Sequence, residues 1–112
     1  DCNVFLGRIP PALFSLPLDR EAVIRHLEAM KKEVELQTSK TLTMEALAEG
    51  FLDIANDNMA AAIRRISIAR GFDVRGDVLV SFGGAGGQHA CEVARRLGIR
   101  QVLQHPLAGV LS

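Results

Sequence analysis

The chain has 112 residues, 48% of them apolar, and its 13 Lys and Arg residues balance 13 Asp and Glu residues. This composition suits one domain with a modest core and argues against a disordered chain. The balanced charge and the absence of Trp and Tyr argue against a nucleic-acid partner. No apolar run approaches the roughly 20 residues that would span a membrane.

The cysteines and the two ends of the chain suggest its setting. Cys2 and Cys91 form no metal or redox motif, so we expect a reducing cytoplasm, with Cys91 packed as a small apolar residue. The chain starts at Asp1 without a methionine, and residues 109–112 stand within an apolar segment. We therefore interpret residues 1–112 as a single partial domain of a longer protein, with some of its surface in contact with the rest of that protein.

The first predicted elements are an extended segment and a loop. The short apolar run Val4-Phe5-Leu6 is expected to be a strand or simply extended. Residues 8–17 are expected to be a loop, because proline forces the residue before it into an extended conformation. Its apolar side chains should anchor the loop on the core; they are Leu13, Phe14 and Leu16.

Two long helices should follow. Asp19 is a good N-cap and starts the first, whose buried face is predicted at Ala22, Val23, Leu27, Met30 and Val34. Thr43 should cap the second, which continues to Gly71 with apolar residues at helical spacing from Leu47 to Ile66. The small residues 60–62 would let a neighbouring backbone approach closely.

The last part of the chain predicts a strand, a glycine-rich loop, a helix and a second strand. The β-branched run from Val78 indicates a buried strand, and residues 83–87 contain four glycines. Residues 91–97 predict a short amphipathic helix that ends at Gly98, and residues 100–104 the next strand. A strand, a helix and a strand in this order predict a parallel crossover, so the fold class is α/β.

A glycine-rich turn before a helix lets an anion approach bare backbone and the positive helix end, and phosphate is the usual anion. Gly86-Gly87-Gln88 lacks the Lys and Ser/Thr of a P-loop. The third glycine of a dinucleotide fingerprint falls on His89, and Gln104 and His105 stand where an acidic residue would follow, which disfavours a Rossmann-like domain. Tight packing of strand on helix is the alternative role for the glycines.

These residues also carry a family resemblance. Residues 82–91, Phe-Gly-Gly-Ala-Gly-Gly-Gln-His-Ala-Cys, followed by Ala94-Arg95 and Leu97-Gly98, resemble the signature of the ATP-dependent 5-oxoprolinase and hydantoinase A family. Residues 1–8, 54–64 and 108–112 resemble further motifs of that family in the same order. The loop between Arg8 and Asp19 is short for a 5-oxoprolinase, which leaves the branch of the family open.

The resemblance implies a fragment of an actin-like, Hsp70-like ATPase lobe. It implies an enzyme that uses ATP and Mg²⁺ to phosphorylate a cyclic amide oxygen, after which hydrolysis opens a lactam or hydantoin ring; 5-oxoproline would give glutamate. The implied partners are the remainder of the parent chain and a hydantoinase B-type subunit or domain, and the isolated segment is expected to be inactive. The alternative is a non-catalytic nucleotide-binding or assembly module of α/β type.

The candidate site residues fall into two groups, and neither includes a metal ligand or an identified catalytic residue. The nucleotide-binding candidates are Gly83, Gly84, Ala85, Gly86, Gly87, Gln88 and His89. The substrate or interface candidates are Asp1, Asn3, Asn56, Asn58 and Arg64. Asn56 and Asn58 are included because asparagine is unfavourable within a helix unless something uses it. His26 and His105 are expected at the surface.

Overall fold

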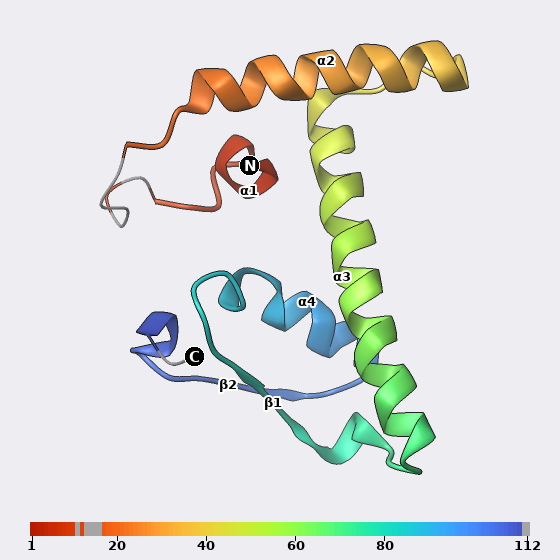
Figure 1. The fold of residues 1–112 in the computed structure, drawn as a ribbon, viewed down its shortest axis with the longest axis vertical. Coiled ribbons are helices and arrows are strands. Elements are labelled where there is room, and N and C mark those ends of the chain that lie inside the picture. The colour runs from red at the N-terminus through yellow and green to blue at the C-terminus, as the bar shows by residue number, and fades with distance from the viewer. Residues whose placement is uncertain (11, 13–16, 111–112) are drawn as a thin grey trace. The chain divides into compact units, whose positions relative to one another are not determined.

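The computed structural model describes residues 1–10, 12 and 17–110, so the expected anchors Leu13, Phe14 and Leu16 lie outside the described residues. The chain divides into two compact units, Asp1–Asp53 and Ile54–Ser112. The long helix α3 (Met44–Ala69) contributes residues to both units (Figure 1).

The first unit begins with a short helix, α1 (Cys2–Phe5), where we expected a strand or extended chain. That expectation is wrong. The amides of Val4 and Phe5 both donate to the carbonyl oxygen of Asp1 at 3.0 Å, which closes a helical turn. In so short an apolar run, periodicity does not distinguish a strand from a helix. Here the packing of the side chains favours the helix. The apolar side chains of α1 pack against the buried Val23 and Leu27.

Helix α2 (Arg20–Thr38) starts where the sequence predicts. The Asp19 carboxylate accepts a hydrogen bond of 2.8 Å from the Ala22 amide, which satisfies one of the free donors at the helix start. Val23 and Leu27 are buried and meet Ala48 of α3. The predicted apolar face is wrong at Met30, which is 41% exposed, whereas Val34, one turn further along α2, is half-buried.

Helix α3 also has the predicted cap, since the Thr43 hydroxyl accepts from the Ala46 amide at 3.1 Å. Its last residue is Ala69, and Gly71 follows in the left-handed conformation. In the second unit, Ala60 is buried in a cluster completed by Val93, Ala94, Leu97 and Ile99. The small side chain at Ala60 thus allows the close approach that the sequence suggested.

The second unit contains the parallel pair of strands, which confirms the α/β class. Strand β1 (Val78–Ser81) pairs with β2 (Gln101–Gln104), with Val80 opposite Leu103. Helix α4 (Gly87–Leu97) connects them and packs on the sheet (Figure 1). It begins earlier than the expected Cys91, because the last residues of the glycine-rich loop already adopt helical geometry.

The expected burial of the strands is wrong in part. Leu79 packs on the cluster beneath α4, and Ser81 is buried. The alternate side chains face the other way: Val80 is 56% exposed and Leu103 59% exposed. Within the described residues, the unit therefore has an apolar sheet face without a covering layer.

Two further expectations concern single residues and membranes. Cys91 is exposed on α4 rather than packed, because the buried face of this helix comprises Ala90, Val93, Ala94 and Leu97. In the described part of the chain, no helix combines the length and the hydropathy needed to cross a membrane.

Candidate functional site

The glycine-rich loop leaves the carboxyl end of β1. Gly83 has a φ of +87°, a left-handed conformation that glycine adopts without the steric cost of a side chain. Its amide donates a hydrogen bond of 2.6 Å to the carbonyl oxygen of the buried Ala108. The loop is thereby attached to the segment that follows β2.

The glycines of this loop have two different surroundings. A side chain at Gly84 would meet no atom within 4 Å, so its backbone is open to a ligand. A Cβ at Gly86 would lie 2.7 Å from the Phe82 carbonyl oxygen and 3.0 Å from the Ser81 hydroxyl. A Cβ at Gly87 would lie 2.3 Å from the side-chain amide of Gln104. A side chain at Gly86 would therefore clash with backbone, one at Gly87 would displace only the end of the exposed Gln104 side chain, and Gly84 presents bare backbone.

The start of α4 adds backbone donors beside this opening. The amide of Gln88 donates to the Ala85 carbonyl and that of His89 to the Gly86 carbonyl, each at 3.1 Å. The amides of Gly86 and Gly87, at the N-cap and the first position of α4, belong to the positions that a helix leaves without an internal acceptor. These donors and the positive end of the helix dipole favour a negatively charged ligand group.

A polar pair joins the middle of α3 to the first turn of α4. Asn56 is only 4% exposed, and its Oδ1 lies 2.8 Å from Nδ1 of His89. The sequence singled out both residues for separate reasons. Their contact spans 33 positions and follows only from the packing of α3 on α4.

His89 also lines a hollow of about 360 Å³ between α3, β1 and α4. Its walls are mostly apolar and include Met59, Ile63, Leu79, Phe82 and Val93. Among the described residues that line it, the polar side chains are those of His89 and the buried Ser81. A hollow of this size with few polar groups has the character of a small-molecule site.

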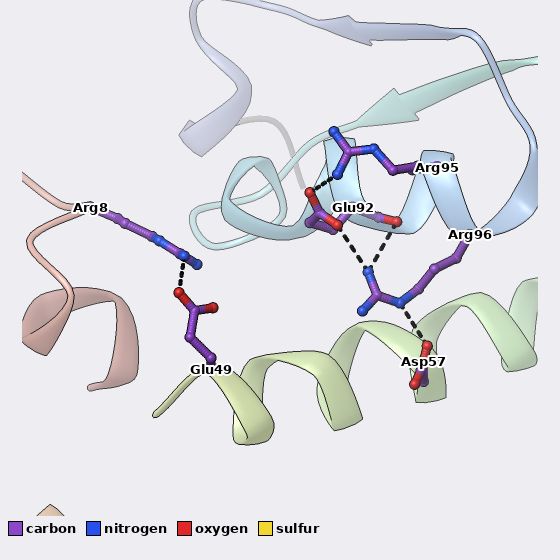
Figure 2. Close-up of polar contacts among 6 residues, drawn as sticks. All are labelled: Arg8, Glu49, Asp57, Glu92, Arg95 and Arg96. Atoms are coloured by element: carbon purple, nitrogen blue, oxygen red, sulfur yellow. Dashed lines mark hydrogen bonds and ion pairs between the residues drawn. The ribbon is translucent and has the colours of Figure 1, made fainter. Parts of the chain in front are cut away.

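The far end of α4 carries a network of charges (Figure 2). Arg96 donates to Asp57 at 2.6 Å and to Glu92 at 3.1 Å, and Arg95 pairs with the same Glu92. The hydrogen bond from Arg95 is the main reason that the pKa of Glu92 lies below its ordinary value. Figure 2 also shows a separate ion pair within the first unit, between Arg8 and Glu49.

Arg64 is placed at this charged end and not at the loop. Its guanidinium Nη2 donates to the carbonyl oxygen of Arg96 at 2.7 Å. A cation at the carboxyl end of a helix is favourable, because it meets the negative end of the helix dipole. Arg64 therefore has a structural partner at the opposite end of α4 from the glycine-rich loop.

The remaining candidates are distributed over both units. Asp1 is exposed and Asn3 is buried in α1, so both belong to the first unit. Asn58 is exposed on α3, and His26 and His105 are exposed as expected. Across residues 1–10, 12 and 17–110, no three His, Cys, Asp or Glu side chains gather in a way that could hold a metal ion.

A parallel strand–helix–strand unit with a glycine-rich turn defines an α/β protein, and its family follows from its similarity to known proteins. The chain belongs to the hydantoinase/oxoprolinase family, whose model matches residues 1–112. It is 45% identical to 5-oxoprolinase PfmaA of Pestalotiopsis fici and 41% identical to the 5-oxoprolinase of Saccharomyces cerevisiae. Each match covers 100% of this chain but 9% of the relative, so the chain spans about a tenth of those proteins.

A solved structure shows the same arrangement of elements. The crystal structure of the ATP-dependent caprolactamase from Pseudomonas jessenii matches with a TM-score of 0.76 and 30% sequence identity. The match covers 96% of this chain and 15% of the caprolactamase chain. The fold predicted for the segment is thus confirmed as an α/β fragment of a much longer type of protein.

Proposed function

We propose that this chain is part of an ATP-dependent hydrolase that opens cyclic amides, with conversion of 5-oxoproline to glutamate as the first reaction to test. The observation that carries the proposal is the match of the whole chain to the hydantoinase/oxoprolinase family. The open backbone at Gly84, directly before α4, supports it as a place where a nucleotide could approach.

In the proposed reaction, bound ATP would supply the phosphoryl group that converts the amide oxygen into a good leaving group. The share of this chain is placement and charge stabilisation. Gly83 and Gly84 allow close approach at the end of β1, and the first amides of α4 stabilise negative charge on a phosphate. Because the chain covers about 9% of its 5-oxoprolinase relatives, the other contacts would come from the remainder of the parent protein.

The residues fit a nucleotide better than they fit an all-protein metal site. Open backbone at Gly84 and donors at the start of α4 suit phosphate oxygens. Mg²⁺ in such a site would be bound by phosphate oxygens together with water and one or two carboxylates. The proposal includes a hydantoinase B-type subunit or domain as partner and a cytoplasmic setting, which agrees with two free cysteines.

The test is ATP hydrolysis by the full-length protein with 5-oxoproline, hydantoin, caprolactam or no cyclic amide. Stimulation by one of these rings, with stoichiometric ring opening, supports the proposal and identifies the substrate. If no cyclic amide stimulates hydrolysis, the proposal is wrong. Tight ATP binding without stimulated turnover would instead favour a nucleotide-binding or assembly module.

A further inference from the structure

The buried Asn56–His89 pair needs an explanation beyond packing. Asparagine is unfavourable within a helix and costly to bury, because its amide must keep hydrogen bonds that water would otherwise provide. Asn56 is 4% exposed, and its oxygen meets Nδ1 of His89 at 2.8 Å. An apolar side chain at this position would avoid the cost altogether. The burial of Asn56 is therefore best explained if its hydrogen bond fixes the orientation of the His89 imidazole.

The chemistry of the two atoms determines which ring nitrogen carries the proton. An amide oxygen can only accept a hydrogen bond, so Nδ1 of His89 must donate to Asn56. In the neutral ring, Nε2 then has no proton and presents a lone pair. Asn56 thereby selects one tautomer and turns the other nitrogen of the ring into an acceptor.

That acceptor belongs to a residue that lines an apolar hollow. The hollow of about 360 Å³ adjoins Phe82 and Gly86 of the glycine-rich loop, and its other walls are mainly aliphatic. Phosphate oxygens are acceptors, so a neutral His89 with Nδ1 already engaged does not suit them. An N–H group on a flat, mostly apolar ring does suit this combination of an acceptor and apolar walls.

We propose that Asn56 is a positioning residue that orients His89, and that Nε2 of His89 accepts a hydrogen bond from an N–H group of a ring-shaped ligand. The inference deepens the proposed function and depends on it for the two ligands that carry such a group. One is the cyclic amide, through its ring N–H. The other is the purine of ATP, through its exocyclic amino group. The shared chemistry is an N–H donor on a planar ring.

Substitutions at His89 can distinguish a role in ligand binding from a hydrogen bond that only joins α3 to α4. The amide of asparagine reaches about as far as Nδ1 of histidine, and that of glutamine about as far as Nε2. His89→Asn therefore keeps the hydrogen bond to Asn56 but removes the acceptor at the position of Nε2. His89→Gln restores an acceptor there.

A matched control exists on the same two helices. Asp57 follows Asn56 on α3 and forms an ion pair of 2.6 Å with Arg96 of α4. Asp57→Asn weakens this second tie between α3 and α4 without touching His89. Asn56→Leu removes the first tie together with its control of the tautomer.

The experiment measures KM for ATP and KM for the stimulating cyclic amide in the full-length protein and in these four variants. We expect His89→Asn and Asn56→Leu to raise one of the two KM values about 3- to 10-fold, the range for loss of one neutral hydrogen bond. His89→Gln should recover at least half of that loss, and Asp57→Asn should change neither KM. The KM that rises identifies the ligand.

Two outcomes would overturn the inference. One is unchanged KM values for both ligands in His89→Asn. The other is an equal change in Asn56→Leu and Asp57→Asn, which would show that the pair only joins the helices. If the unsubstituted protein hydrolyses ATP without stimulation by any cyclic amide, the proposed function fails, but KM for ATP still tests the role of His89.

Discussion

The amide of Gly83 donates a hydrogen bond of 2.6 Å to the carbonyl oxygen of Ala108, which connects the glycine-rich loop to the segment after β2. Gly83 is the loop residue in the left-handed conformation, and Ala108 is buried. The bond therefore holds the turn from one side while the backbone of Gly84 stays open. This arrangement gives the glycines distinct roles that substitutions can separate.

Gly86 should be the loop glycine that the fold requires most. Gly86→Ala places a Cβ 2.7 Å from the carbonyl oxygen of Phe82, and we expect it to lower the free energy of unfolding by about 1–3 kcal/mol. Gly84→Ala meets no neighbouring atom and should change it by less than about 0.5 kcal/mol. Urea denaturation of both variants measures the difference. Equal stabilities would show that the loop relaxes around the new methyl group.

A large side chain at Gly84 should block the nucleotide without harming the fold. A Cβ at Gly84 meets no atom within 4 Å, so we expect Gly84→Leu to keep a normal melting temperature but to bind ATP more weakly, measured by titration calorimetry on the full-length protein. Gly76→Leu is the matched control, because Gly76 is equally open but precedes β1 at the other end of the strand. Unchanged ATP affinity in Gly84→Leu would remove the loop from the nucleotide site.

Arg96 should contribute more to stability than its neighbour Arg95. The Arg96 side chain is 21% exposed and pairs with both Asp57 and Glu92, whereas Arg95 is 72% exposed and, among the described residues, pairs with Glu92. We expect Arg96→Met to lower the free energy of unfolding by about 1 kcal/mol and Arg95→Met by less than about 0.5 kcal/mol. Chemical denaturation at low and high salt checks both values. A larger loss for Arg95→Met would contradict the assignment.

The Asp73–Arg75 pair should make a pH-dependent contribution to stability. The hydrogen bond from the Arg75 side chain, assisted by the Arg75 amide, lowers the pKa of Asp73 from 3.8 to about 2. Because the folded-state pKa is the lower one, the contribution is complete above 3.8 and disappears as the pH falls toward about 2. The stability difference between the parent and Asp73→Asn should shrink across that window. A difference that stays constant with pH would exclude this carboxyl as its source.

Much of the fold could be predicted because its signals are local. Asp19 and Thr43 cap the helices that the sequence assigns to them, and Gly98 ends α4 in the left-handed conformation. A cap depends on a side chain and an amide three positions away, so sequence alone contains it. The order of strand, loop, helix and strand was predictable for the same reason.

The features that could not be predicted depend on contacts between residues that lie far apart in the sequence. The helical turn at Val4 depends on packing against Val23 and Leu27, which lie about twenty residues away. The contact between Asn56 and His89 likewise depends on how α3 packs on α4. The sequence named both polar residues as candidates but contained no local signal that they meet. Cys91 is exposed because the buried face of α4 includes its neighbour Ala90 instead.

The exposed face of the two-stranded sheet has a practical consequence. Val80 lies beside Leu103 in register, and more than half of each side chain is open to water. Paired strands with a bare apolar face and a free edge adhere to similar surfaces. We therefore expect the isolated segment to self-associate at concentrations at which a domain with a covered sheet would remain monomeric. Light scattering over a dilution series is therefore the first measurement to make on it.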